Sequence, residues 1–188
     1  MKIAVINNYD SFVYNLVHYL ESFDGLETEV FLNDKVYMED LDAFDKILLS
    51  PGPGLPKEAG KLLEIIDHFK EKKSILGVCL GHQAIAEYFD CQLINLKKPL
   101  HGTTSKLRQI TDDFLWKDVP NETTIGHYHS WCVDPEKVSE AIIVTAIDEW
   151  GNIMALKHKN LNLRGIQFHP ESILTPEGKK MLENWVFQ

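Results

Sequence analysis

The chain has 188 residues, of which 44% are hydrophobic and 25% are charged, and its formal net charge is −9. These values are typical of a globular protein, and we expect a single domain over residues 1–188. The acidic balance, with no basic stripe, argues against a nucleic-acid partner. Cys79, Cys91 and Cys132 form no Cys-x-x-Cys pair, which disfavours a disulfide framework or a metal site and fits a reducing compartment.

The first half of the chain alternates short apolar runs with helical patterns. The spacing predicts strands at 2–6, 28–32, 46–49 and 74–78, and helices at 11–22, 57–72 and 81–89. Asp10 or Ser11 is the expected cap of the first helix. Alternation of this kind indicates a parallel sheet. The apolar run at 3–6 is too short for a signal peptide and no segment is long enough to cross a membrane, so we expect a cytoplasmic protein with no membrane contact.

The second half of the chain reads mostly as strands. They are predicted at 91–96, 105–110, 123–127, 141–147, 153–157 and 165–168, and a C-terminal helix follows at 178–187. The fold class is therefore α/β. We expect one domain with a central, mostly parallel sheet flanked by helices, and a small added antiparallel layer before the last strand rejoins the main sheet.

Cys79 is the first candidate for chemistry. It follows the strand at 74–78 and precedes a helix, and Gly77 and Gly81 flank it. A cysteine in such a position is usually core filler, but the Gly-x-Cys-x-Gly pattern matches a nucleophile elbow, a tight and strained turn that exposes its central side chain. The N-terminus of the following helix favours the thiolate, which is the nucleophilic form.

Two further loops follow predicted strands, where ligands of open α/β sheets bind. Ser50-Pro51-Gly52-Pro53-Gly54 can aim backbone N–H groups into a pocket, although a plain turn is the simpler interpretation of this loop alone. His169-Pro170-Glu171 lies at the end of the 165–168 strand. Glu171 is two residues from His169 in an extended stretch, so it can orient the imidazole.

Cys79, His169 and Glu171 together form the nucleophile, base and orienting acid expected for acyl transfer. The natural donors to an oxyanion are the backbone N–H of Leu80 and those of the Gly52–Gly54 loop.

With these motifs the chain resembles the class I, triad-type glutamine amidotransferases, and among them the glutaminase subunit (component II) of anthranilate synthase and aminodeoxychorismate synthase. The matching segments span nearly the whole chain; they are 8–12 with 14–16, 50–54, 77–83, 128–130 and 165–172. The segment Asn8-Tyr9-Asp10-Ser11-Phe12 points to the chorismate-using branch.

The resemblance implies that Cys79 attacks the side-chain amide of L-glutamine, giving a γ-glutamyl thioester and ammonia, and that water assisted by His169 then releases glutamate. It also implies which residues contact the substrate: Gly52, Pro53, Gly54, Leu80, Gln83, Ser130 and Trp131. No cofactor and no metal are expected. The implied partner is a larger chorismate-binding synthase subunit (component I) that receives the ammonia: anthranilate synthase, for tryptophan biosynthesis, with aminodeoxychorismate synthase, for folate biosynthesis, as the alternative.

The chain departs from the usual pattern of these subunits at three positions. It has Thr103 where lysine is usual, Trp131 where an aliphatic residue is usual, and His127 where arginine is usual. Two alternatives stay open: the glutaminase subunit of a split GMP synthetase, which the 8–12 segment disfavours, and a flavodoxin-like ligand-binding module that is not an enzyme. No Gly-x-x-x-x-Gly-Lys-Ser/Thr pattern supports nucleotide binding by such a module.

Overall fold

A five-stranded parallel sheet forms the centre of the computed structural model, which describes residues 1–188. Its strands lie in the order β2 (Glu27–Leu32), β1 (Lys2–Asn7), β3 (Lys46–Leu49), β4 (Ser74–Val78) and β9 (Leu163–Ile166). Every residue of β3 and β4 is buried, which explains why these strands are continuous apolar runs rather than alternating patterns. The carboxyl ends of the five strands meet at one edge, where ligands of such sheets bind.

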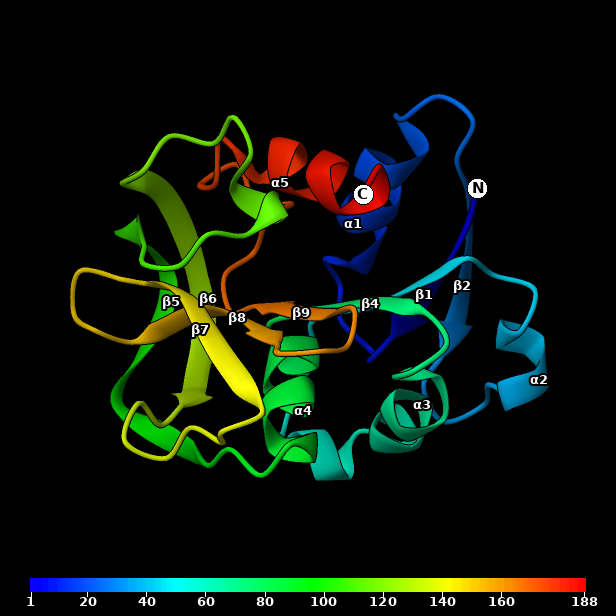
Figure 1. Cartoon of the computed structure of the whole chain (residues 1–188), viewed down its shortest axis with the longest axis horizontal. Coiled ribbons are helices and arrows are strands. Elements are labelled where there is room, and N and C mark those ends of the chain that lie inside the picture. Colours follow the sequence, from blue (N-terminus) through cyan, green and yellow to red (C-terminus); the bar gives the residue numbers. More distant parts are fainter.

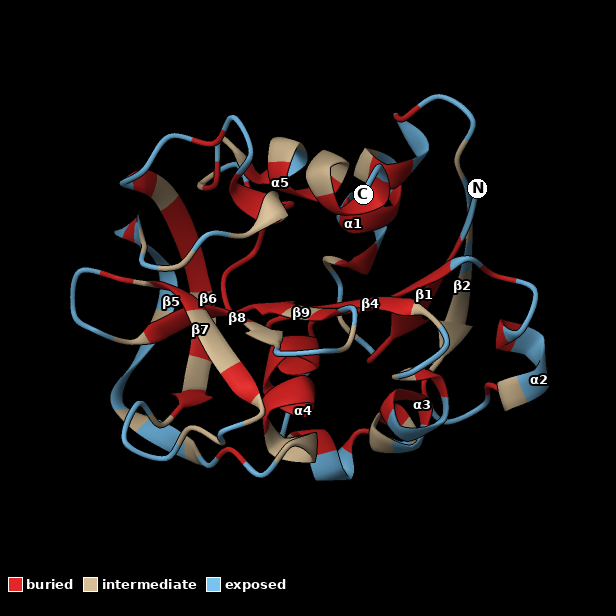
Figure 2. Ribbon diagram, in the orientation of Figure 1, coloured by how far each residue is buried: buried red, intermediate tan, exposed pale blue.

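Helices cover both faces of this sheet (Figure 1). Helices α1 (Val13–Glu21) and α5 (Gly178–Val186) lie on one face, and α3 (Leu62–Phe69) and α4 (Leu80–Tyr88) lie on the other. Their apolar sides pack against the strands in two hydrophobic clusters of 25 and 23 buried residues. Figure 2 shows the buried strands between the helices, whose outer surfaces are more exposed. None of the helices is long and apolar enough to cross a membrane.

The antiparallel strands continue the same sheet beyond β9. They follow in the order β8 (Ile153–His158), β7 (Ile142–Ile147), β5 (Leu93–Gln109) and β6 (Thr123–Val133). β5 and β6 form a long hairpin that stands away from the parallel part (Figure 1). The predicted fold class, a single α/β domain with a mostly parallel core and an antiparallel addition, is confirmed.

Several local predictions were wrong. The two strands predicted at 91–96 and 105–110 are one 17-residue strand, β5, because two register shifts in its pairing with β6 absorb the Pro99 and Gly102 region. The helix predicted at 57–72 is a 3₁₀ turn, Pro56–Glu58, followed by α3. The short helix α2 (Met38–Leu41) and a second 3₁₀ turn, Phe114–Trp116, were not predicted.

The cap predicted for the first helix was also wrong. Helix α1 begins at Val13, and its N-cap, Phe12, forms no side-chain cap hydrogen bond. The Asp10 carboxylate instead accepts a 2.7 Å hydrogen bond from the backbone N–H of Phe12. Asp10 therefore shapes the turn that leads into the helix rather than the helix terminus itself.

Candidate active site

Cys79 lies at the sharp turn between β4 and α4. Its φ of 52° and ψ of −99° place a non-glycine residue in a strained conformation, as a nucleophile elbow requires. A Cβ atom at Gly77 would lie 2.3 Å from the backbone of Gly81, and one at Gly81 would lie 2.4 Å from the carbonyl oxygen of Leu49. Both glycines are therefore needed for α4 to pack this closely on β3 and β4.

The thiol is less exposed than the sequence suggested. Cys79 is 6% exposed, so the expectation of an exposed nucleophile was wrong, because strands and loops close around the turn. It is reached through a cavity of about 210 Å³. This cavity is lined by Gly52, Pro53, Gly54, Cys79, Gln83, Tyr128, His129, Ser130 and Trp131. Its size suits a small ligand, since drug-sized ligands occupy roughly 300–1,000 Å³.

One wall of the cavity is the loop after β3. Asn8 fixes this loop from the end of β1: its backbone N–H donates to Ser50 Oγ at 3.0 Å and its side-chain amide donates to the Ser50 carbonyl at 2.8 Å. A Cβ atom at Gly52 would lie 2.5 Å from Asn8 Cβ, so the two segments touch. The backbone N–H groups of Gly52 and Gly54 donate to no backbone carbonyl, which leaves them free to bind an anionic or carbonyl oxygen.

Leu80 does not line the cavity with its side chain, which lies in the core between α4 and the sheet. Only its backbone can serve the predicted role. Leu80 is the first residue of α4, so its N–H has no partner within the helix. This donor and those of the Gly52–Gly54 loop are the candidates for an oxyanion hole.

His169 and Glu171 are not among the residues that line the cavity. Nδ1 of His169 is 2.6 Å from Oε1 of Glu171, and the two residues are 2% and 5% exposed. The rings of Phe12 and Tyr128 form T-shaped contacts with the imidazole, with centroid distances of 6.0 and 5.0 Å. The loop is anchored to β6, because the backbone N–H of His169 donates to the carbonyl of Gly126.

The surroundings of the His169 imidazole change its pKa in two opposite directions. Burial disfavours the charged ring, but the Cys79 sulfur and the Glu171 carboxylate outweigh burial and raise the pKa of His169 well above its usual value of 6.5. Nε2 of His169 has no hydrogen-bond partner in the protein. It is therefore the ring nitrogen that can exchange a proton with a reacting group, while Nδ1 is held by Glu171.

The sequence prediction assigned no role to Gln167, which lies against the nucleophile. Gln167 Nε2 lies 3.6 Å from Cys79 Sγ, and the other end of its amide accepts a hydrogen bond from Gln83 Nε2 at 3.0 Å. Gln83 Nε2 also donates to the carbonyl of Trp131 at 2.8 Å, so only its oxygen can face a ligand. His129, which lines the cavity, was also missed, although its place two residues before Trp131 on a strand puts both on one face.

The Trp131 side chain reaches Asn95 on β5. Its indole Nε1 lies 3.1 Å from the side-chain amide of Asn95, whose oxygen accepts the hydrogen bond when the amide is oriented to match. Asn95 is the residue opposite Trp131 in the β5–β6 pairing. Ser130 and Trp131 both line the cavity.

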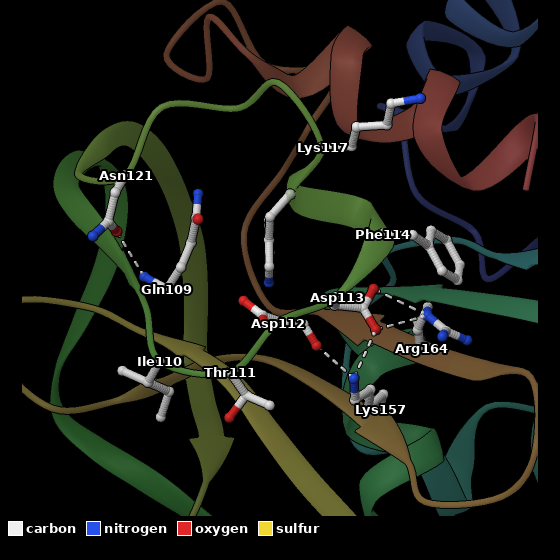
Figure 3. Close-up of a pocket in the computed structure, with 11 residues that line it drawn as sticks. Gln109, Ile110, Thr111, Asp112, Asp113, Phe114, Lys117, Asn121, Lys157 and Arg164 are labelled. Carbon is white, nitrogen blue, oxygen red and sulfur yellow. Dashed lines mark hydrogen bonds and ion pairs between the residues drawn. The ribbon is translucent and has the colours of Figure 1, made fainter.

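A larger cavity of about 830 Å³ shares no residue with that of Cys79. Figure 3 shows Asp113 between Lys157 and Arg164, at 3.3 and 3.1 Å. These charged groups satisfy one another, and no cysteine, serine or histidine lines the cavity. No group of three or more His, Cys, Asp or Glu side chains could hold a metal ion. The Cys79 cavity is therefore the candidate active site.

Comparison with known proteins finds one matching family model, glutamine amidotransferase class-I, over residues 4–188. A Bacillus subtilis protein named aminodeoxychorismate/anthranilate synthase component 2 is 42% identical over 98% of this chain and 95% of its own length. Anthranilate synthase component 2 of Pseudomonas aeruginosa is 40% identical over 99% and 95%. Aminodeoxychorismate synthase component 2 of Escherichia coli is 40% identical over 98% of both chains.

Two more similarities are to a longer protein and to a solved structure. Bifunctional protein TrpGD of Thermotoga maritima is 42% identical over 98% of this chain, which spans only 32% of that longer protein. Among solved structures, a crystal structure of a Thermoplasma acidophilum protein assigned to GMP synthase has a TM-score of 0.88 and 25% identity, and the match covers 100% of this chain and 92% of that one.

Proposed function

We propose the following activity for this chain, which belongs to the class I glutamine amidotransferase family: it is a glutaminase whose nucleophile is Cys79 and whose base is His169, oriented by Glu171. The observation that carries the proposal is the placement of Cys79 at a strained elbow in a small cavity, near a hydrogen-bonded His169–Glu171 pair whose imidazole pKa the Cys79 sulfur helps to raise.

The geometry supports a two-step reaction. The Cys79 thiolate attacks the side-chain amide carbon of L-glutamine, and the N–H groups of Leu80 and the Gly52–Gly54 loop stabilise the oxyanion. Collapse breaks the C–N bond, and protonated His169 gives its proton to the departing nitrogen, which leaves as ammonia. Water, deprotonated by His169, then attacks the γ-glutamyl thioester, releasing glutamate and the Cys79 thiolate.

Glutamine would lie with its amino-acid end against Gln83 and the backbone of Ser130 and Trp131. The free oxygen of Gln83 can accept from the ammonium group of the substrate, because both N–H groups of that amide bind within the protein. The cavity wall formed by Pro53 and the two neighbouring glycines closes the other side.

We further propose that the chain works as component II beside a larger chorismate-binding synthase (component I) that consumes the ammonia. Direct transfer is favoured because free ammonia is mostly protonated at neutral pH and then no longer nucleophilic. Anthranilate synthase, for tryptophan, is the leading assignment and aminodeoxychorismate synthase, for folate, is the second. The similarity is 40% to a relative of either kind, and 42% to one that carries both names.

A role in GMP synthesis and a role as a binding module have less support. The similarity to the protein assigned to GMP synthase is 25%, against about 40% for the component 2 proteins, so a GMP synthetase glutaminase ranks below the chorismate branch. A flavodoxin-like binding module is set aside because the chain belongs to an enzyme family. A cytoplasmic location remains part of the proposal and is supported by three free cysteines.

The test is Cys79→Ser in the complex reconstituted with each candidate synthase. Glutamine-dependent product formation should fall by at least about 10³-fold, while product formation from added ammonia is unchanged, because only the ammonia source is lost. The synthase that gives glutamine-dependent product with the wild-type chain identifies the pathway. Equal use of glutamine by the variant would contradict the assignment of the nucleophile.

A further inference from the structure

The backbone carbonyl of Trp131, in the cavity wall, accepts two hydrogen bonds. One comes from His129 Nδ1 at 2.9 Å and the other from Gln83 Nε2 at 2.8 Å. A carbonyl oxygen can only accept, so both partners must be donors. The Trp131 carbonyl therefore fixes the tautomer of the His129 ring and the orientation of the Gln83 amide.

The first branch runs from this carbonyl through two histidines. Because Nδ1 of neutral His129 carries the proton, its Nε2 must accept, and the 3.1 Å contact from His127 makes Nδ1 of His127 the donor. Nε2 of His127 must then accept the hydroxyl hydrogen of Ser105, at 2.6 Å. All three residues are at most 6% exposed.

The strand pairing places these residues together. His127 and His129 are two apart on β6, so they share a face of the hairpin, and their ring centroids are 5.3 Å apart. Thr103 on β5 is directly opposite His127, so Ser105 is its diagonal neighbour, within reach of the ring. Burial lowers the pKa of both histidines to about 4, which keeps them neutral at pH 7.

The second branch runs from the same carbonyl to the nucleophile. Gln83 Nε2 uses its second hydrogen on Gln167 Oε1, at 3.0 Å, so the amide nitrogen of Gln167 must be the end that faces Cys79 Sγ. A donor placed against the sulfur stabilises the thiolate. The two branches join at one carbonyl and extend from Ser105 in β5 to Cys79 at the elbow.

We propose that Ser105, His127 and His129 are positioning residues, which hold the Trp131 carbonyl and, through Gln83 and Gln167, keep a hydrogen-bond donor on the Cys79 sulfur. They touch neither the reacting atoms nor the scissile bond. Their consequence for glutamine turnover rests on the proposed function, whereas the hydrogen-bond order itself does not.

The hydrogen-bond order is tested on the wild-type chain by NMR. Long-range ¹H–¹⁵N correlation of histidine-labelled protein at pH 7 should show both rings neutral and protonated at Nδ1, with signals assigned through His127→Asn and His129→Asn. A proton at Nε2 of either ring, or a charged ring, would overturn the proposal. This measurement needs neither glutamine nor a partner.

The consequence for the nucleophile is tested with three variants of His129. Asparagine places its amide nitrogen where Nδ1 was and can still donate to the Trp131 carbonyl, whereas glutamine reaches the Nε2 position and alanine reaches neither. Alkylation of Cys79 by iodoacetamide should slow by at least about 3-fold in His129→Ala and His129→Gln and recover in His129→Asn, because the Trp131 carbonyl then loses one of its two donors and no longer holds the Gln83 amide in place. Equal rates in all three folded variants would overturn the proposal.

The effect on catalysis is measured as the KM for glutamine in the reconstituted complex. His129→Ala should raise the KM for glutamine by about 10-fold, the size expected for a lost buried hydrogen bond, and His129→Asn should stay within about 3-fold of wild type. Equal KM values for these two variants would contradict the role of the carbonyl. A wild-type complex that does not use glutamine, with the tautomer and alkylation results as expected, would instead refute the proposed function and leave the hydrogen-bond chain in place.

Discussion

At the scale of single residues, Cys79 differs from the other two cysteines of the chain in its surroundings. Burial raises the pKa of Cys91, and it raises that of Cys132 to about 11, so both thiols stay protonated at neutral pH. Cys79 alone lines the candidate cavity and stands at a helix N-terminus. The three cysteines are buried to a similar extent, but only Cys79 is expected to react, because of its place in the cavity and at the start of α4.

Glu171 is expected to act through the imidazole that it holds. Glu171→Gln keeps the size of the side chain but removes its charge, so the pKa of His169 should fall and the ring can adopt the wrong tautomer. We expect the kcat of glutamine hydrolysis to drop by about 10²–10⁴-fold with a small change in KM. An NMR titration of His169 checks the pKa, and steady-state kinetics checks kcat. A variant with wild-type kcat would show that Glu171 is only structural.

The sequence was enough to select candidate residues that lie in a local motif with a known chemical role. It was not enough to select residues whose role depends on contacts with distant parts of the chain. Cys79 between two glycines and His169 before Pro-Glu are local patterns with a chemical meaning. Gln167, His127 and His129 show no such pattern, because their partners come from the elbow, α4 and β5. The sequence held one signal for them: His127, His129 and Trp131 are spaced two apart, which places them on one face of a strand.

At the scale of elements, the elbow depends on how closely α4 approaches the sheet. Gly77→Ala forces a Cβ atom to within 2.3 Å of the Gly81 backbone, so α4 must move. We expect a loss of about 3 kcal/mol or more in the free energy of unfolding, measured by urea titration, together with loss of glutaminase activity.

Gly102→Ala is the matched control for this substitution. A Cβ atom at Gly102 meets nothing within 4 Å, and only its φ of +65° opposes the change. The expected cost is about 1–2 kcal/mol, with activity retained. If both variants lost the same stability, close packing at the elbow would not be the cause.

The elements were predicted well where burial is uniform and poorly where the chain bends. The buried strands β3 and β4 have the predicted bounds, because continuous apolar runs between turns leave little choice of where a strand begins and ends. β5 was split in the prediction, because Pro99 and Gly102 usually end a strand, and only the pairing with β6 shows that the strand continues through its bulges. The cap of α1 was misplaced because the Asp10 carboxylate binds the backbone N–H of Phe12 in the turn before the helix.

At the scale of the whole molecule, the buried histidines should make folding sensitive to acid. The pKa values of His127 and His129 are lowered to about 4, mainly by burial, with the charge of nearby His169 opposing protonation of both and Asp148 favouring that of His129. Their usual pKa is about 6.5, so the unfolded chain binds more protons between pH 6.5 and 4. Their contribution to stability is therefore present above pH 6.5 and is lost as the pH falls through about 4.

Urea titrations between pH 7 and 4.5 check this expectation. The wild-type free energy of unfolding should fall by a few kcal/mol over this range, before most carboxylates titrate. The double variant His127→Asn and His129→Asn should show a shallower pH dependence, whatever its stability at pH 7. Burial also lowers the pKa of His82 to about 3, so this residue adds a fall in stability that the wild type and the double variant share. His169 contributes little below pH 6.5, because its ordinary pKa keeps it largely protonated in the unfolded chain and its raised pKa keeps it protonated in the folded chain. An unchanged slope in the double variant would contradict the assignment to this pair.

During turnover, Cys79 should carry the glutamyl group as a thioester. The decisive experiment quenches the reconstituted complex in acid within its first turnovers of glutamine and measures the intact mass and the peptide masses of this chain. We expect a mass gain equal to glutamine minus ammonia, located on the peptide of Cys79 and absent in Cys79→Ser, with Cys91 and Cys132 unmodified. Glutamine turnover with no adduct under conditions that trap thioesters, or an adduct on another residue, would contradict the role of Cys79 as the nucleophile.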